Sequence, residues 1–414
     1  MKPWVKIIIA LVLGVIAGLI LNIQHDPSPF LLKLQDIIGL IGKAFIDLLK
    51  MLVGLIVFSS LVVGMCHISD PKKLGRIGTR TILFYAGTTV LAVVFGLVMV
   101  FLVRPGTGLG LPLPANLGGA QTVGLTDFLF GIVPSNPFAA FSEGNILQII
   151  VFAVFFAFAI NMAGERGKKV LSLLESVSEV MYSLTHFIMR LAPYGVFALI
   201  LTAVSSVGFK VIVPLLTFLL CNYIAFALQI GIVFCLSLKY LSKLEVAPFF
   251  KGMKDAIVLA FTTSSSSATL PVSLDCARNH LGISPDISGF VLSLGSTINM
   301  NGAAIGQAIS AIFIAQAYGI EVTVVKVLIL VFVSLVSAIG AAGIPGTGIV
   351  MLSVVLNAMG LPIEGIALVA GVDRIREMGS AVVNVLGDAV AAVFIAQKEG
   401  QINEKRYHKI TWLE

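Results

Sequence analysis

Charge is scarce in this sequence. Only 12% of the 414 residues are Asp, Glu, Lys or Arg, whereas 58% are hydrophobic and the mean hydropathy is +1.03. A water-soluble domain of this size needs a charged surface, and this composition does not supply one. The sequence therefore excludes an ordinary soluble protein.

Cysteine and histidine are also few. The four cysteines are Cys66, Cys221, Cys235 and Cys276. They have no paired spacing and most of them fall in apolar runs, so we expect packing residues rather than a disulfide or a zinc site. The five histidines are scattered and form no ligand set. A serine hydrolase is disfavoured as well, because there is no Gly-x-Ser-x-Gly motif and the sequence places no base beside a candidate nucleophile. We expect no enzymatic activity.

Long apolar stretches stand where a soluble protein would carry charge. About 20 apolar residues span a bilayer as a helix. The stretches of this kind are 4–23, 36–65, 81–103, 144–162, 211–238, 286–316, 323–341 and 347–372. They predict an all-α polytopic membrane protein.

Lys and Arg residues gather in alternate connections between these stretches, whereas the connections near 24–35, 104–121 and 206–212 carry one basic residue each. Basic residues are enriched in the cytoplasmic loops of membrane proteins. The net charge of +6 is therefore interpreted as an orientation signal and not as a nucleic-acid surface. We expect a multi-pass protein of the plasma (inner) membrane with both termini in the cytoplasm.

Two apolar segments are interrupted near their middle, 245–280 at TTSSSSATLP and 323–361 at GAAGIPGTG. On either side of the interruption each segment is too short to span a bilayer twice. Each is followed by a long helix that we also expect to be broken, at 297–304 (TINMNGAA) and at 382–389 (VVNVLGDA). A hairpin followed by a broken helix, occurring twice, predicts the inverted repeat of a secondary transporter. The breaks SNPF and SEGN similarly predict short broken helices within 122–162.

Four consecutive serines, 264–267, lie at the first interruption. Lipid tolerates non-helical backbone only where it is buried in protein or lines a wet cavity. Two re-entrant hairpins that meet near the midplane would form such a place, and their N–H groups and helix dipoles would bind a carboxylate. The alternative is that the serines hydrogen-bond back into helix turns. Four serines followed by Thr-Leu-Pro favour a broken helix.

The last apolar helix carries a polar stripe. Its members are Asp373, Glu377, Ser380, Asn384 and Asp388, spaced three or four residues apart. Such spacing places side chains on one helical face, and charges at membrane depth mark function by default. The alternative is an ion-pair ladder, including Asp373 and Arg374, that holds this helix to its neighbours.

Oxygen-rich groups near this stripe predict a site for a hard cation. Asp388 would lie beside carbonyl groups freed by the broken helices, which suits Na⁺. Tyr85, Thr88 and Thr89 add three more oxygens on one helical turn. Alone, that trio would be an ordinary polar packing patch.

Together, the SSSSATLP, NMNG, AAGIPGTG and DxxxExxxxxxNVLGD elements resemble one family. It is the family of glutamate/aspartate and neutral amino acid transporters, or dicarboxylate/amino acid:cation symporters. APYGVF (192–197) and IFIAQA (312–317) extend the resemblance, which runs essentially end to end. It implies eight transmembrane helices, two re-entrant helical hairpins and a homotrimer in which a transport domain moves across the membrane like an elevator against a fixed scaffold.

The resemblance also implies a division of the chain into domains. Scaffold helices 1 and 2 would occupy residues 1–66. The third helix, which belongs to the transport domain, would occupy residues 67–114 together with an external loop. Scaffold helices 4 and 5 would occupy residues 115–207, and the rest of the transport domain would occupy residues 208–414. The last part would contain helix 6, hairpin 1 (about 245–280), helix 7 (about 286–316), hairpin 2 (about 323–361), helix 8 (about 362–398) and a cytoplasmic tail.

Ligand sites follow from the same resemblance. The substrate would meet Ser265, Ser266, Ala303, Gly343, Ile344, Gly348, Glu377, Ser380, Ala381 and Asn384. A first sodium ion would bind at Gly295, Asn299, Asn384 and Asp388, and a second at Thr297, Ala338, Ile339 and Ala341. A third would bind at Tyr85, Thr88, Thr89, Asn299 and Asn301, where Asn301 replaces the usual Asp and removes a full charge.

The departures from the family pattern bear on the substrate. Ser380 stands where transporters of acidic amino acids carry an Arg, and losing a fixed cation from a desolvated pocket disfavours a second substrate carboxylate. We therefore expect Na⁺-coupled uptake of a neutral, small or polar amino acid. The alternative is a Na⁺- or H⁺-coupled symporter of glutamate, aspartate or a dicarboxylate that uses Arg376, one turn before Ser380. An anion channel is a remote alternative, because the hairpins are not arranged as a symmetric pore.

Overall fold

The computed structural model of the chain describes residues 3–23, 29–68, 76–112, 133–340 and 347–408. These residues are almost entirely helical, and the β interaction within them is an isolated bridge between Ile283 and Ile402. The all-α prediction is confirmed. Among the described residues, the helical segments long and apolar enough to cross a membrane are Arg76–Val103, Ile212–Leu241, Pro285–Ala317 and Ile363–Lys398.

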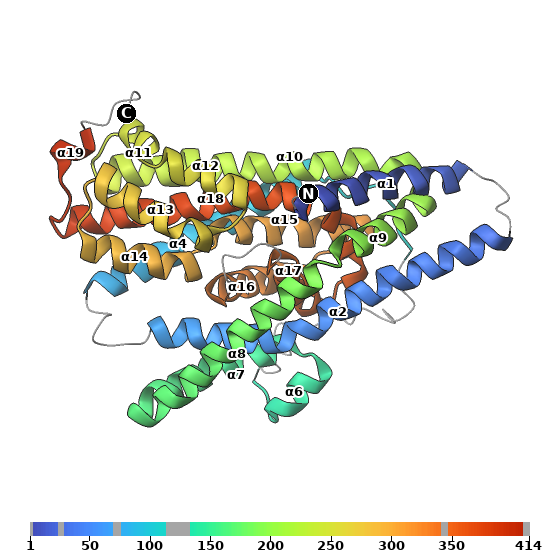
Figure 1. Cartoon of the computed structure of the whole chain (residues 1–414), viewed down its shortest axis with the longest axis horizontal. Coiled ribbons are helices and arrows are strands. Elements are labelled where there is room, and N and C mark those ends of the chain that lie inside the picture. The colour runs from blue at the N-terminus through green and yellow to red at the C-terminus, as the bar shows by residue number, and fades with distance from the viewer. Residues whose placement is uncertain (1–2, 24–28, 69–75, 113–132, 341–346, 409–414) are drawn as a thin grey trace.

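The N-terminal half is organised around one long helix. α2 (Pro29–Ile68) packs against α7 (Ile146–Met162), α8 (Glu165–Met189) and α9 (Ala192–Val207), and α1 (Pro3–Ile23) lies along α9 (Figure 1). Glycines permit the last contact, because a Cβ on Gly14 would come within 2.9 Å of the Phe197 carbonyl oxygen and one on Gly18 within 2.8 Å of the Leu201 carbonyl oxygen. The α1–α9 pair is therefore closely packed.

A short helix, α6 (Pro137–Glu143), precedes α7. The Asn136 side chain caps its N-terminus, Gly144 ends it in the left-handed conformation with φ 67°, and the Asn145 side chain caps α7. Asn and Gly are the residues expected at such helix ends. The breaks predicted at SNPF and SEGN are confirmed, and residues 122–132 of the predicted segment lie outside the described residues.

The C-terminal half surrounds a buried central helix, α15 (Asn301–Ala317). It packs against α4 (Arg76–Val103), α10 (Ile212–Leu228) and α18 (Ile366–Lys398). α10 continues through the wider helical turns η2 (Gln229–Phe234) and η3 (Ser237–Leu241). Burying a polar group in such a helix is costly unless it is hydrogen-bonded. Asn301 and Gln316 have partners on α4, whereas Gln307 Oε1 is buried without a hydrogen-bond partner among the described residues.

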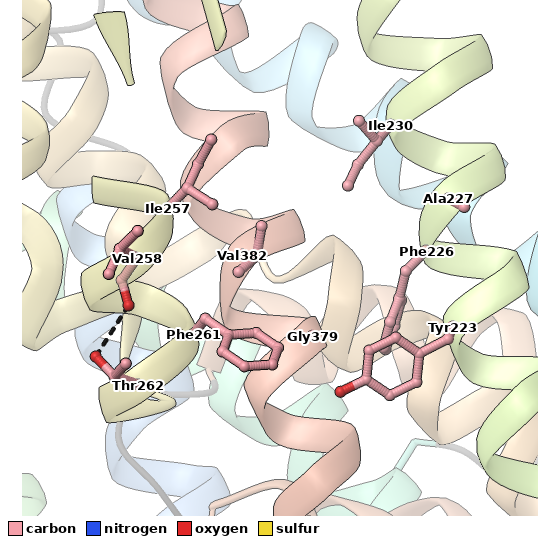
Figure 2. A pocket seen from close by; sticks show the side chains of 10 residues that line it. All are labelled: Tyr223, Phe226, Ala227, Ile230, Ile257, Val258, Phe261, Thr262, Gly379 and Val382. Atoms are coloured by element: carbon pink, nitrogen blue, oxygen red, sulfur yellow. Dashed lines mark hydrogen bonds between the residues drawn. The ribbon is translucent and has the colours of Figure 1, made fainter. Parts of the chain in front are cut away.

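The first interrupted segment forms two helices that pack against each other, α12 (Lys254–Thr263) and α13 (Ser266–Asp275). They lie between α11 (Val246–Gly252) and η4 (Cys276–His280). The chain reverses at Ser264, which has φ 54°, and Ser265, whose hydroxyl accepts a hydrogen bond from the Ala268 N–H at 3.1 Å. The break predicted at the serine run is confirmed. α10, α12 and α18 leave a cavity of about 410 Å³ between them (Figure 2).

The second interrupted segment contains α16 (Val324–Gly340) and α17 (Thr347–Ala358), both of which contact α2. Its predicted tip, with Ala341, Gly343 and Ile344, lies outside the described residues. The apolar stretch 347–372 is not one helix, because Gly360 takes φ 63° and Pro362 cannot continue a helix. A short turn, η5 (Ile363–Gly365), then leads into α18.

The interruption predicted at 382–389 is wrong, because α18 is continuous through it. The Asn384 side chain accepts a hydrogen bond from the Gly302 N–H at 2.7 Å. A Cβ on Gly387 would lie 3.0 Å from the amide nitrogens of both Asn299 and Asn301. Asn384 and Gly387 therefore make contacts between helices and do not interrupt α18. The interruption predicted at 297–304 is confirmed, since α14 (Pro285–Ile298) and α15 are separated by two non-helical residues.

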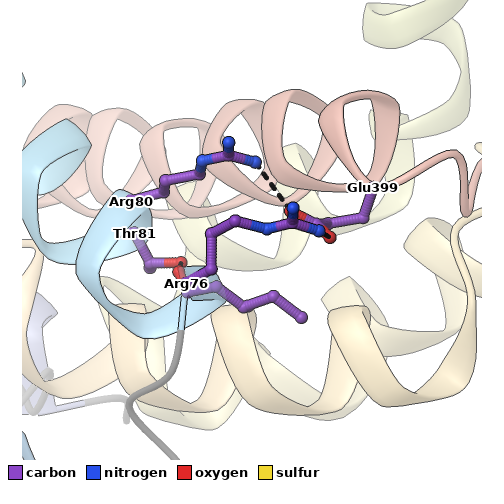
Figure 3. A network of polar contacts seen from close by, with 5 residues as sticks. Arg76, Arg80, Thr81 and Glu399 are labelled. Carbon is purple, nitrogen blue, oxygen red and sulfur yellow. Dashed lines mark hydrogen bonds and ion pairs between the residues drawn. The ribbon is translucent and has the colours of Figure 1, made fainter.

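Two arginines of α4 pair with the C-terminal end of α18 (Figure 3). Arg80 Nη1 lies 2.7 Å from Glu399 Oε1, and Arg76 pairs with the other carboxylate oxygen. The Glu399 side chain is 8% exposed, whereas that of Arg76 is 67% exposed. Most of the carboxylate's interaction is therefore sheltered from solvent.

We expect Glu399→Gln to lower the free energy of unfolding by about 1 kcal/mol and the melting temperature by roughly 2 °C, because it removes the shared charge between α4 and α18. The measurement is thermal unfolding in detergent. Glu165→Gln is the matched control, since Glu165 pairs with Lys168 at 2.6 Å but is 86% exposed. Equal shifts in the two variants would contradict the expectation.

Candidate functional site

The polar stripe of α18 is buried. Asp373, Glu377, Ser380, Asn384 and Asp388 are each at most 9% exposed. Helix geometry places them on one face, and that face meets α13, α14, α15 and α17. Carboxylates in such surroundings need partners, because an isolated buried charge is costly.

The first two partners come from the same helix. Arg376, which is 4% exposed, forms an ion pair with Asp373, with 2.6 Å from Nη2 and 2.7 Å from Nε to Oδ1. Arg374 Nη1 lies 3.6 Å from Glu377 Oε2. Two positive and two negative side chains therefore form a neutral group. The ladder considered for Asp373 and Arg374 would join this helix to its neighbours, whereas both of these ion pairs lie within α18.

Arg376 occupies a gap that two glycines leave open. A Cβ on Gly348 of α17 would lie 2.8 Å from Arg376 Nη2 and 3.0 Å from Glu377 Oε1. A Cβ on Gly306 of α15 would overlap Arg376 Nη1. The guanidinium group therefore lies where α15, α17 and α18 meet, next to two of the residues predicted to contact substrate.

The turn between α12 and α13 reaches the same region from another direction. Asn384 Nδ2 donates to Ser266 Oγ at 3.4 Å, and Arg374 Nη2 donates to the Thr263 carbonyl oxygen at 3.1 Å. The Ser264 hydroxyl is buried and has no hydrogen-bond partner among the described residues. The predicted substrate residues Ser265, Ser266 and Asn384 are thus brought together, with the N-terminus of α13 directed at them. Backbone N–H groups at such a terminus favour an anion.

α15 closes the region through Gly302. A Cβ on Gly302 would lie 2.6 Å from the Ser380 Cα, so the two backbones are in direct contact. Ala303 follows Gly302 and is partly buried, whereas Ala381 is 4% exposed. The structure therefore places Ala303 and Ser380 on facing helices, as the substrate prediction requires.

We expect Gly302→Ala to abolish uptake of any substrate, because the added methyl group forces α15 away from α18 at the site. Gly87→Ala is the control, since Gly87 lies in a helix with no atom within 4 Å of its Cβ position. Alanine there should be neutral or slightly stabilising. The measurements are uptake into proteoliposomes and melting temperature. Full uptake by Gly302→Ala would contradict the close backbone contact.

Asp388 lies at a candidate cation site. Asn299 Nδ2 donates to Asp388 Oδ1 at 2.8 Å, and Asn299 Oδ1 is buried without a hydrogen-bond partner in the described chain. A Cβ on Gly295 would lie 2.6 Å from Asp388 Cγ. A buried carboxylate beside an amide oxygen without a donor suits a hard cation. Three of the four residues predicted for the first sodium ion converge here, and the fourth, Asn384, lies one turn before Asp388 on α18.

The residues predicted for a third sodium ion also come together. The Thr89 hydroxyl lies 2.7 Å from Asn301 Oδ1, and Asn301 Nδ2 donates to Thr88 Oγ1 at 3.2 Å. The Tyr85 hydroxyl donates to the Val291 carbonyl oxygen at 2.8 Å. These groups hydrogen-bond to protein partners, as a polar packing patch would.

Sequence reasoning missed Gln229 in this cluster. Its Nε2 donates to the Thr88 carbonyl oxygen at 3.0 Å, and its Oε1 is buried without a hydrogen-bond partner in the described part of the chain. The available signal was one amide within the apolar run FALQIGIVF (226–234). Such a residue is costly to bury in an apolar helix unless it has a partner on a neighbouring one.

The second predicted sodium set is only partly described. Thr297 is exposed and its hydroxyl donates to the Leu294 carbonyl oxygen at 2.8 Å. Ala338 is buried near the end of α16, which contacts α14. The side chain of Ile339 and all of Ala341 lie outside the described residues.

Residues 4–398 match the family model described as the sodium:dicarboxylate symporter family. The chain belongs to this family. Membership confirms the resemblance drawn from the motifs, and it makes this multi-pass membrane protein a transporter and not an enzyme.

Curated relatives match nearly the whole chain. The proton/sodium-glutamate symport protein of Bacillus subtilis (strain 168) is 37% identical over 407 residues, which cover 96% of this chain and 93% of the relative. The proton/glutamate-aspartate symporter of Escherichia coli (strain K12) is 34% identical over 417 residues, covering 97% and 94%. The C4-dicarboxylate transport protein of Bacillus subtilis (strain 168) is 30% identical over 411 residues, covering 97% and 94%.

Proposed function

We propose that this symporter takes up an acidic amino acid or a C4-dicarboxylate together with Na⁺ or H⁺. The observation that carries the proposal is the Arg376 guanidinium, buried beside Glu377 and Gly348. A buried arginine at membrane depth is a functional residue by default, and its planar fork suits carboxylates. The names of the relatives, which describe glutamate, glutamate-aspartate and C4-dicarboxylate transport, favour this alternative over the neutral amino acid that Ser380 alone suggests.

In the proposed complex, the α-carboxylate of an amino acid meets Ser266 at the turn after α12, and its ammonium group meets Glu377. The side-chain carboxylate of the substrate then binds Arg376, because position 380 carries serine and not arginine. The two positions are four residues apart, or about 6 Å along the helix axis, a distance that the long arginine side chain spans. Arg376 would share its five N–H donors between Asp373 and the substrate.

A second candidate is uptake of a neutral amino acid, and one observation favours it. Arg376 already has a carboxylate partner, Asp373, at 2.6 Å. If that pair stays closed during transport, the substrate side chain meets only the small residues Ser380, Ala381 and Ala303. Both candidates use the same cation site.

The coupling ion is proposed to bind at Asp388, supported by Asn299 Oδ1, which has no hydrogen-bond partner among the described residues. Na⁺ and H⁺ both suit a buried carboxylate. We further propose a homotrimer of eight-span protomers with two re-entrant hairpins, divided into scaffold and transport domain at the boundaries given above and moving as an elevator. The reversal at Ser264 and Ser265 supports the first hairpin.

The test is uptake by the purified protein in liposomes. L-glutamate, L-aspartate, succinate, L-serine and L-alanine are compared under an inward Na⁺ gradient, an inward H⁺ gradient and a K⁺ control. The proposal expects cation-dependent uptake of an acidic substrate. Uptake of serine or alanine alone would replace it by the second candidate. Gradient-independent flux would refute coupling in both.

A further inference from the structure

The cavity between α10, α12 and α18 is apart from the candidate substrate and cation sites (Figure 2). Its volume is about 410 Å³, and its lining comes from α10 with η2, from α12, and from Gly379 and Val382 of α18. An apolar cavity of roughly 150 Å³ is already large enough to hold benzene. This cavity therefore has room for a substantial apolar ligand.

The polar groups in the lining are already bonded. The Tyr223 hydroxyl donates to the Ile375 carbonyl oxygen at 2.7 Å, and the Thr262 hydroxyl donates to the Val258 carbonyl oxygen at 2.9 Å. Water in the cavity would lack the two to four polar partners that buried water needs. The lining thus suits hydrocarbon and gives no anchor to an amino acid, a dicarboxylate or an ion.

The mouth of the cavity opens beside lipid-facing side chains. Val258 is 62% and Phe261 40% exposed on α12. A ridge of exposed apolar residues on α10 leads to the mouth at Ala227; it consists of Val213, Leu216, Leu220 and Ile224. α10 and α12 lie along the side of the molecule away from α2, α7 and α8 (Figure 1). No element of the described chain covers these side chains, and an apolar side chain that no protein covers contacts acyl chains within the bilayer.

We propose that this cavity binds an acyl chain of a membrane phospholipid. The chain enters along the α10 ridge and lies between α12 and α18. The floor of the cavity is Gly379. A Cβ at this position would lie 2.9 Å from the Phe226 ring, so the Phe226 side chain packs directly on the α18 backbone. Gly379 precedes Ser380, and α12 leads into the turn at Ser264. The acyl chain therefore packs directly behind the candidate substrate site and holds α12 against α18.

The experiment uses the full chain in nanodiscs of phosphatidylcholine that carries a diazirine in one acyl chain. After irradiation, labelled peptides are mapped by mass spectrometry. The native protein is expected to be labelled at 226–230 and 257–262. Ala227→Phe fills the mouth and should reduce that labelling at least fivefold. Leu102→Phe, a change at a 76% exposed position on α4 away from both the cavity and the ridge, should leave it unchanged.

A second variant keeps the test decisive if Ala227→Phe does not fold. Val258→Trp narrows the mouth from the α12 side and should also reduce labelling. Equal labelling of the native protein and both mouth variants would overturn the proposal. Absence of lipid label at 226–230 and 257–262 in the native protein would overturn it as well, because no acyl chain would then reach the cavity. The readout is independent of substrate and coupling ion.

Discussion

Arg376→Met is expected to lower the free energy of unfolding by roughly 3–5 kcal/mol and to abolish uptake of acidic substrates. Asp373 is buried and its carboxylate lies 2.6 Å from Arg376 Nη2, so the variant leaves a buried charge without its cation. Denaturation of the purified protein and uptake of L-glutamate and succinate measure the two effects.

The double variant Arg376→Met/Asp373→Leu separates the effect on stability from the effect on uptake. Replacing both members of a buried ion pair by apolar residues of similar size is often neutral or stabilising. The double variant should therefore regain most of the stability but not the uptake of acidic substrates. If it regains uptake as well, Arg376 only balances Asp373 and the clamp is refuted. If neither variant loses stability, the buried ion pair itself is contradicted.

Asp388→Asn should weaken the apparent affinity for Na⁺ on the order of 100-fold, which corresponds to about 3 kcal/mol. The substitution keeps the shape and removes the negative charge beside Asn299 Oδ1. The measurement is the Na⁺ dependence of melting temperature and of uptake, because binding to the native state raises its stability.

Asp275→Asn is the control for Asp388→Asn, since the Asp275 carboxylate accepts a hydrogen bond from Asn279 at 2.6 Å at an exposed position. It should leave the Na⁺ dependence unchanged. An Asp388→Asn protein with the native Na⁺ dependence would place the coupling ion elsewhere. Loss of uptake under a pH gradient, with no Na⁺ effect in the native protein, would assign Asp388 to proton coupling.

Hydropathy and spacing predicted much of this architecture. The all-α class follows from the apolar stretches, and the buried stripe of α18 follows from polar residues three or four positions apart. The reversal at the serine run was predictable because hydroxyl side chains compete with the helix for backbone hydrogen bonds. Each of these predictions depends only on residues that are close to one another in the sequence.

The predictions that failed depend on contacts between distant segments. The sequence around Asn384 and Gly387 suggests a helix break, yet Asn384 bonds to Gly302 and Gly387 admits the Asn299 and Asn301 side chains. Asn and Gly have low helix propensity, and contacts with neighbouring helices outweigh that propensity here. The pairing of Arg376 with Asp373, by contrast, agrees with their separation of three residues, which places the two side chains next to each other, whereas the adjacent Arg376 and Glu377 do not face each other.

The contact of Arg376 with Gly306 and Gly348 makes the residue types at three positions on three helices depend on one another. A methyl group at either glycine occupies the volume that the guanidinium group fills, so alanine is admissible at 306 or 348 only in a chain whose residue 376 is shorter or turned aside. Selection on substrate charge would therefore act on α15 and α17 together with α18. A shorter residue at 376 tolerates glycine at both positions, whereas an arginine at 376 requires that 306 and 348 carry no side chain.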